Sequence, residues 1–444
     1  MGNYKVLVFI ITDFARSDGA VLWAANMLEC FSRVPGMNFS IVSIGPEEVR
    51  KANETFVRTL GLNHLFVPFL SPPTPGRDTR WSRLSTTADR LLTVLSEKYF
   101  FLLERDARRQ KHVDVAAMDI VRETRPDLII VNGRNAALHV RSVFSLNIRC
   151  CFITLDNEIA YQKMNRSQAG PLGEKLTHRV ERWISRSGNW VADSRFRSWI
   201  DWLYRHCAGV VALSRNDLPP DLPNHVIRAV IPPILKKKDL QWRYRATRCL
   251  LFVGTITVLK YVHVANRLAI EWICTQLAPE LSRIDARVKV IIIGARSDQV
   301  PSSWQQSNIT FLGRADKESV AQQMSSADLF IAPIANNLGA KLKLAECVSY
   351  GTPFLATEAA MSGLPFLTSI PRIDLDHPRA AAGLVLEHMD NPEELLKLCQ
   401  SITTQAQQAR AEQDTAWITF LRNSVTADDS SMRPTGSMDN CEAT

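Results

Sequence analysis

The 444-residue chain has no run of apolar residues long enough to cross a bilayer, which takes about 18 uninterrupted residues. The apolar run near its start, from Val6 to Ile11, is closed by Thr12 and Asp13 and has no small-residue cleavage site after it. Neither a membrane anchor nor a secretory leader is predicted. We therefore expect a cytoplasmic chain, or one that rests on a membrane surface.

Metal-binding and disulfide spacings are also missing. The nine cysteines are scattered, no C-x-x-C occurs, and only Cys150 and Cys151 are adjacent. An odd, scattered set is typical of reduced, buried thiols, so we expect neither a disulfide nor a zinc site. No acidic pair has convincing metal-ligand spacing, which predicts a reaction without a metal or another cofactor.

Neither sign of charge dominates the whole chain, but its small excess of positive charge is unevenly distributed. Residues 1–244 hold 35 Lys and Arg against 24 Asp and Glu, whereas residues 245–444 hold 18 against 21. The basic half indicates contact with something anionic, or simple solubility. Its Trp- and Arg-rich stretch, residues 174–207, suits either a peripheral membrane contact or core packing, which we favour. No nucleic-acid module accompanies the charge, so we expect no nucleic acid.

What the chain does have is a twice-repeated alternation of strands and helices, in a length that exceeds one core of about 250–300 residues. In the first half, apolar β-branched runs predict strands at 5–11, 39–45, 127–131, 151–156 and 209–214. A helix follows the first strand, and 84–125 and 174–207 read as mainly helical. The second half repeats the pattern, with strands at 249–254, 288–294, 309–313, 328–334 and 352–357 and helices at 266–277, 317–325 and 340–350. Pro279 lies just beyond the first of these helices and Gly351 ends the last.

Each series is typical of a doubly wound, Rossmann-like α/β domain. We predict a first domain at 1–235, a second at 249–426, and a disordered polar tail at 427–444. The charged segment 232–248, which opens with two prolines, is the predicted linker. Two such domains enclose a cleft at the carboxyl ends of their strands, where ligands of parallel sheets bind.

The segment with most chemistry runs from Ile334 to Thr357. A loop of small and polar residues leads into a helix that opens with Lys341, Lys343 and Glu346. Helix-start N–H groups and the macrodipole favour a phosphate, Lys341 adds positive charge, and Glu346 could accept hydrogen bonds from ribose hydroxyls. Together they suit a nucleoside diphosphate. The alternative, strongest for Lys343, is a surface helix with solvated side chains.

In order and spacing, residues 249–365 resemble the donor-binding domain of group 1 (family 4-like) glycosyltransferases, a retaining family of GT-B fold. The matching segments are LLFVGT, VKVIIIG, NITFLG, SADLFIAPI, GAKLKLAE and GTPFLAT. The resemblance implies a glycosyltransferase of carbohydrate biosynthesis that uses a nucleotide-diphosphate sugar, with retention. The acceptor would be a carbohydrate, a lipid-linked sugar or a small molecule.

The resemblance also implies site residues. Lys341 would lie near the donor diphosphate and Glu346 at the ribose, and these two are the predicted catalytic residues. Other predicted donor-binding residues are Gly254, Thr255, Gly313, Arg314, Asn336, Asn337, Gly339, Ala340 and Lys343. The first half resembles the acceptor domain more weakly, and there the predicted cleft residues are Gly19, Asp156, Asn157 and Glu158, of which the last three could instead form a capped turn.

One position departs from the common family pattern. Many members carry two glutamates separated by seven residues, and Leu338 stands where the first would precede Glu346. A subset of the family lacks that glutamate. Two alternatives therefore stay open: a non-catalytic relative that binds a nucleotide sugar or a protein partner, and another GT-B enzyme such as a sugar-nucleotide epimerase. The lysine-glutamate spacing argues against the epimerase.

Overall fold

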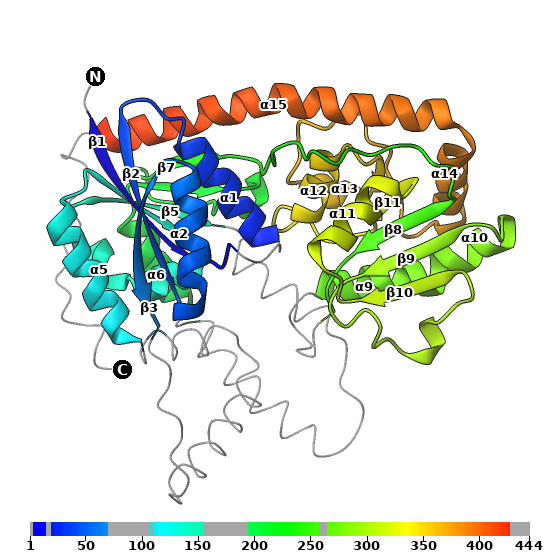
Figure 1. Cartoon of the computed structure of the whole chain (residues 1–444), viewed down its shortest axis with the longest axis horizontal. Coiled ribbons are helices and arrows are strands. Elements are labelled where there is room, and N and C mark those ends of the chain that lie inside the picture. Colours follow the sequence, from blue (N-terminus) through cyan, green and yellow to red (C-terminus); the bar gives the residue numbers. More distant parts are fainter. Residues whose placement is uncertain are drawn as a thin grey trace, which may run out of the picture.

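The computed structural model describes residues 3–14, 19–69, 107, 110–154, 194, 196–256 and 264–426. Each half of the chain builds one parallel sheet, and each sheet is the centre of one lobe (Figure 1). This arrangement confirms the prediction of two doubly wound α/β domains. The predicted tail at 427–444 lies outside the described residues.

The first sheet has seven strands in the order β3-β2-β1-β4-β5-β6-β7, all parallel. The strands are β1 (Tyr4–Ile11), β2 (Met37–Gly45), β3 (Asn63–Pro68), β4 (Leu128–Asn132), β5 (Arg149–Thr154), β6 (Gly209–Ala212) and β7 (Ile227–Val230). The helices with described bounds are α1 (Gly19–Phe31), α2 (Arg50–Thr59), α5 (Lys111–Thr124) and α6 (Gly133–His139), and residues 196–205 are also helical.

Strand β1 shows why this sheet is covered on both faces. Its side chains alternate between two buried clusters, as the two-residue period of a strand requires. Leu7 and Phe9 pack with α5 and α6, whereas Val6, Val8 and Ile10 pack with α1 and with the distant C-terminal helix. An unbroken apolar run therefore marks a strand buried on both sides.

The second sheet has five parallel strands in the order β10-β9-β8-β11-β12. They are β8 (Cys249–Val253), β9 (Lys289–Ile293), β10 (Ile309–Gly313), β11 (Leu329–Ala332) and β12 (Phe354–Ala356). The helices are α9 (Val264–Trp272), α10 (Ala278–Ile284), α11 (Lys317–Ser326), α12 (Leu342–Tyr350), α13 (Glu358–Met361), α14 (Pro378–Asp390) and α15 (Pro392–Thr426).

Two predictions about helix ends have opposite outcomes. Gly351, with φ +71°, ends α12 in the left-handed conformation, as predicted. Pro279 does not end a helix, because the chain passes from α9 through a wider, π-type turn at residues 273–277 into α10. Proline is tolerated in the first turn of α10, because the wide turn has already interrupted the regular backbone ladder there.

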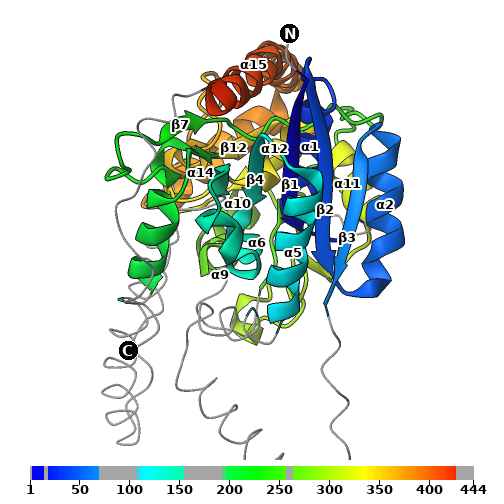
Figure 2. The same ribbon diagram turned by 90° about the vertical axis from the view of Figure 1, so that its left-hand side faces the viewer.

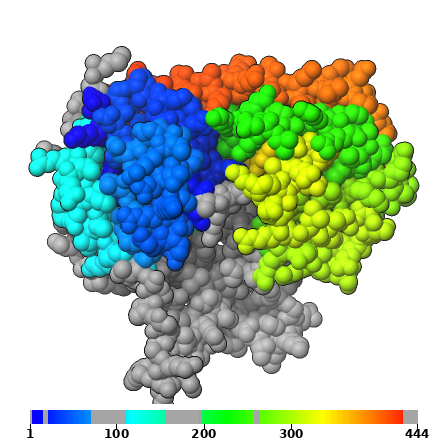
Figure 3. Space-filling view, in the orientation of Figure 1, coloured from blue at the N-terminus to red at the C-terminus, as the bar shows by residue number. Residues whose placement is uncertain are grey.

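Helix α15 belongs to both domains. Leu395, Leu398 and Ile402 pack into the core of the second sheet, while Trp417 and Phe420 pack into that of the first. Figures 1 and 3 show the helix running across both lobes, and Figure 2 shows it nearly end-on above the strands of the first sheet. The predicted second domain, 249–426, thus contains residues whose packing partners lie in the first.

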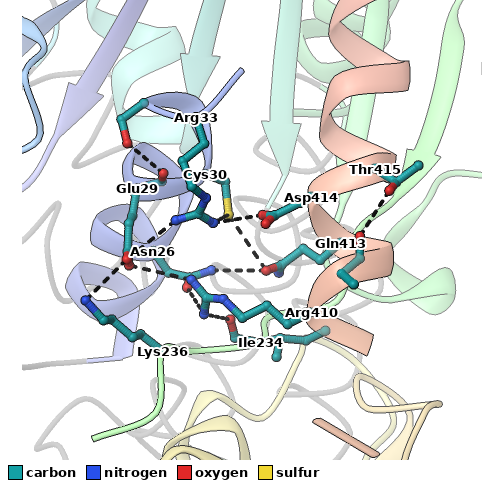
Figure 4. A network of polar contacts seen from close by, with 12 residues as sticks. Asn26, Glu29, Cys30, Arg33, Ile234, Lys236, Arg410, Gln413, Asp414 and Thr415 are labelled. Carbon is teal, nitrogen blue, oxygen red and sulfur yellow. Dashed lines mark hydrogen bonds and ion pairs between the residues drawn. The ribbon is translucent and has the colours of Figure 1, made fainter. Parts of the chain in front are cut away.

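The linker and α15 pass between the domains side by side. Arg410 donates to the carbonyl oxygen of Ile234 (3.1 Å) and to Asn26 of α1 (3.0 Å), and Gln413 donates to the carbonyl oxygen of Pro232 (2.6 Å) (Figure 4). Further along, the linker is hydrogen-bonded to the second domain, since the Lys238 N–H donates to the Ser349 carbonyl at 2.9 Å. The linker and α15 are the two segments that cross between the domains, and both are held next to α1.

Candidate functional site

Two predicted donor-binding glycines, Gly254 and Gly313, meet a third glycine, Gly294, at the carboxyl edge of the second sheet. Gly254 follows β8, Gly294 follows β9, and Gly313 ends β10. The Gly254 N–H donates to the Ile293 carbonyl and the Gly294 N–H to the Gly313 carbonyl, both at 2.8 Å. Gly294 has φ +152°, and a β-carbon there would collide with the carbonyl oxygen of Gly254. Glycine is therefore required for these strand ends to approach so closely.

Lys343, in the first turn of α12, is joined to the end of β8 through Asn266. Its Nζ donates to Asn266 Oδ1 at 2.6 Å, and Asn266 Nδ2 donates to the Thr255 carbonyl at 3.1 Å. The same Nζ lies 4.5 Å from the centroid of the Phe252 ring. Sequence reasoning named Asn266 only as the opening of a helix, so its role in holding Lys343 was missed.

The ammonium group of Lys343 lies in a poorly solvated place. Burial, and then the nearby charge of Lys341, together lower its pKa to about 7, and no carboxylate of the described residues forms an ion pair with it. Its hydrogen bond is to an amide oxygen, which supplies no counter-charge. The alternative predicts a solvated surface lysine, whereas the structure shows a partly exposed side chain whose amine is held by Asn266.

Lys341 is placed differently from the prediction. It is the residue that precedes α12 rather than part of its first turn, and its side chain folds back over its own loop. Its Nζ donates to Asn336 Oδ1 (2.9 Å), to the Gly339 carbonyl (3.0 Å) and to the Leu338 carbonyl. The expectation of a mobile positive charge is corrected, because the amine is held by loop oxygens.

Glu346 lies one turn further along α12 and is only partly exposed. Burial raises the pKa of its carboxyl to about 7, and the positive charges of Lys238 and Lys317 oppose that rise. Lys238 belongs to the linker and Lys317 begins α11, so Glu346 lies near these two elements, whereas Lys343 is joined to the end of β8. Arg314, which follows β10, is exposed.

The loop before α12 lies against the first domain. The Gly339 N–H donates to Asp217 Oδ1 at 2.8 Å, and Asn216 Nδ2 donates to the Asn337 carbonyl at 3.1 Å. Ala340 also packs against the buried cluster of the first sheet. The sequence predicted only a strand, 209–214, in this part of the first domain, and nothing in its pattern points to a partner more than 120 residues away.

The predicted acceptor side is described only in part. Gly19 is the first residue of α1, whereas Asp156, Asn157 and Glu158 lie outside the described residues. In the Trp-rich stretch, Trp199 is buried in the core of the first sheet and Trp202 packs against it, as favoured above. Trp183 and Trp190 are outside the described residues. Within the ranges given above, no helix is both long and apolar enough to cross a bilayer.

Comparisons with known proteins agree with this architecture. Residues 247–397 match the family described as "Glycosyl transferases group 1". No curated protein sequence matches the chain significantly. Among solved structures, sucrose-phosphate synthase from Thermosynechococcus elongatus superposes with a TM-score of 0.60 at 12% identity, covering 96% of this chain and 100% of that one.

Two further structures give the same result. TarM has a TM-score of 0.57 at 10% identity, with 96% of this chain and 99% of that chain covered. HepE from Anabaena, solved in complex with UDP and glucose, has a TM-score of 0.56 at 12% identity, with coverage of 95% and 100%. At such low identities these likenesses establish the fold alone. The chain thus has the GT-B fold, and its residues 247–397 match the group 1 glycosyltransferase family.

Proposed function

We propose that the protein transfers a sugar from a nucleoside-diphosphate sugar bound at the carboxyl edge of the second sheet, beside Lys343. The observation that carries this proposal is the state of that ammonium group, which lies partly buried between an amide oxygen and an aromatic ring with a lowered pKa. A desolvated ammonium without a counter-charge is costly. A phosphate oxygen would supply the missing charge.

The neighbouring groups suit the rest of a nucleoside diphosphate. Phosphates bind readily at helix starts, and α12 begins next to Lys343. The Glu346 carboxyl, which accepts no hydrogen bond from any described residue, is available to the two ribose hydroxyls. From there the base would reach the Gly313–Arg314 segment. HepE was solved with UDP and glucose, which makes UDP a reasonable first probe.

The chemistry follows from where charge develops. The bond between the anomeric carbon and the diphosphate oxygen breaks, and the electron pair leaves with the diphosphate. A hydroxyl of the acceptor forms the new bond to that carbon and loses its proton, which the departing diphosphate takes up. Lys343 and the start of α12 would stabilise the charge on the departing diphosphate, and one preorganised group of this kind typically contributes about 10²–10³ in rate.

The finer features of the reaction rest on the family resemblance. Retention of the anomeric configuration and independence of a metal are part of the proposal, as is an acceptor of carbohydrate, lipid-linked or small-molecule type.

One observation favours a second candidate, a non-catalytic protein that binds a nucleotide sugar. Leu338 replaces the first of the two family glutamates, and its carbonyl oxygen binds Lys341 within the loop.

A ligand panel tests the proposal. UDP, GDP and ADP, with their glucose conjugates, are added to the full chain, and thermal shift and isothermal titration calorimetry are recorded. A true ligand at 100 times its Kd stabilises the folded state by about 2.7 kcal/mol, which gives a shift of several degrees. Release of the nucleoside diphosphate in the presence of an acceptor separates an enzyme from a binding protein. If no nucleotide binds, the proposal is refuted.

A further inference from the structure

We propose that Asp217 and Asn216, in the first domain, are positioning residues that fix the donor loop of the second domain, residues 336–340. The donor site would then be complete only while the two domains are in contact. This inference rests on the proposed function, because it assigns the loop to a nucleotide-sugar donor. It concerns two residues of the first domain to which the family resemblance assigned no role.

The two positioning residues lie on a short turn that follows β6. Residues 215–217 form this turn, and Ser214 caps it by accepting a hydrogen bond from the Asn216 N–H at 3.3 Å. Asp217 is fully buried, whereas Asn216 is exposed. A buried carboxylate is expensive unless hydrogen bonds compensate it, so the contacts of Asp217 are strongly specified.

The turn contacts the donor loop at two successive peptide groups. Asp217 accepts from the Gly339 N–H at 2.8 Å, and Asn216 donates to the Asn337 carbonyl at 3.1 Å. Ser362, also in the second domain, donates to the same Asn337 carbonyl at 3.0 Å, and Ser214 donates to the Ser362 carbonyl at 3.3 Å. Three hydrogen bonds thus connect this turn and its cap in the first domain with the loop and with Ser362, which supports the loop from within the second domain.

The other polar groups of this loop are held from within the second domain. Lys341 binds the carbonyl oxygens of Leu338 and Gly339. The backbone from Asn337 to Gly339 is therefore fixed partly by the loop's own lysine and partly by the opposite domain. Because α12 starts right after this loop, the turn of the first domain also fixes where Lys343 enters the site.

The residues act through the loop and need no contact with the ligand. When the domains separate, the Gly339 N–H loses its partner and the Asn337 carbonyl keeps only Ser362, so the loop loses two of its fixed points. Donor affinity would then depend on domain contact. Loss of a charge-assisted, buried hydrogen bond of this kind is expected to weaken donor binding about tenfold or more.

The first test measures the loop without any ligand. Hydrogen–deuterium exchange of the peptide covering residues 336–341 is compared in the wild type, Asp217→Ala, Asp217→Asn and Asn216→Ala. We expect faster exchange in Asp217→Ala and a smaller increase in Asn216→Ala, with protection restored in Asp217→Asn because its amide oxygen still accepts from Gly339. Asp221→Ala, an exposed aspartate four residues on, is the control and should match the wild type.

The second test measures UDP affinity by calorimetry in the same variants. Asp217→Ala should raise Kd about tenfold, Asp217→Asn should stay within about threefold of the wild type, and Asp221→Ala should not change it. Should Asp217→Ala fail to fold, the exposed Asn216→Ala carries the test. Unchanged loop exchange in the folded variants overturns the positioning role. A wild type that binds no nucleotide instead refutes the proposed function, and the exchange data still decide whether the turn fixes the loop.

Discussion

Replacing Lys343 by methionine removes the ammonium group that we place against the donor diphosphate and keeps most of the apolar stem beside Phe252. Asn266 loses one partner but still donates to the Thr255 carbonyl, so the end of β8 stays tied to α9. Since the wild-type ammonium is poorly solvated, we expect no loss of thermal stability in Lys343→Met. A stability change therefore cannot explain a loss of binding.

The expected loss of affinity follows from the chemistry of one charged contact. A hydrogen bond to a charged group contributes about 1.5–3 kcal/mol, and about 1.4 kcal/mol corresponds to a tenfold change in Kd. Lys343→Met should therefore weaken nucleoside-diphosphate binding about 10- to 150-fold. Two unit charges 4 Å apart attract each other by about 4 kcal/mol at an effective dielectric constant of 20. This energy is an upper limit for the contribution of the Lys343–phosphate contact to binding.

The assay is isothermal titration calorimetry with UDP, or with whichever nucleotide binds best in the panel. Lys289→Met is the matched control, because Lys289 is an exposed lysine of the same domain at the start of β9, the opposite edge of the sheet. It should bind as the wild type does. If Lys343→Met folds normally and its Kd lies within twofold of the wild type, the assignment of the diphosphate to this amine is wrong.

Three other outcomes are expected. Glu346→Gln should raise the Kd of UDP about tenfold but leave the Kd of inorganic pyrophosphate unchanged, because the carboxyl is assigned to the ribose; equal losses for both ligands in calorimetry would contradict that assignment. Because a lysine is neutral above its pKa, and that of Lys343 is lowered to about 7, UDP affinity should fall about tenfold between pH 7 and pH 8.5 in the wild type. This fall should be absent in Lys343→Met, in which Glu346, whose pKa is also raised to about 7, still titrates. Trp417→Ala should cost about 3–5 kcal/mol of the free energy of unfolding in urea, since this fully buried ring packs against Phe31 in the core of the first domain; a change below 1 kcal/mol would contradict that packing.

Local patterns predicted most of the strands. Long apolar β-branched runs, such as Val6 to Ile11, require burial on both faces, and in a strand-helix alternation that is enough to predict a parallel sheet. Helix ends were harder to predict. Pro279 is a strong local signal for an end, and a wide turn before it overrode that signal. The position of a wide turn depends on packing against the sheet, which the local sequence does not encode.

In the candidate site, too, the sequence predicted groups that lie close together in the chain but not their distant partners. Residues close together in the chain, such as Lys343 and Glu346 on one helix, could be grouped from their spacing, and the glycines at strand ends could be placed at one edge of the sheet. The partners that decide what these groups do are distant. Asn266 holds Lys343 from 77 residues away, and the direction in which Lys341 folds depends on the carbonyl oxygens of a loop whose shape no local pattern specifies.

Two α/β domains follow from the amino-acid sequence alone, because the alternation of buried strands and amphipathic helices is a local property of the chain. The packing of α15 into the core of the first domain, and the contact of Asp217 with the donor loop of the second, became apparent only in the folded molecule. Both are contacts between segments separated by more than a hundred residues. Such contacts form only when whole domains pack together, since no neighbouring residue can supply the buried surface or the hydrogen-bond partner that each one needs.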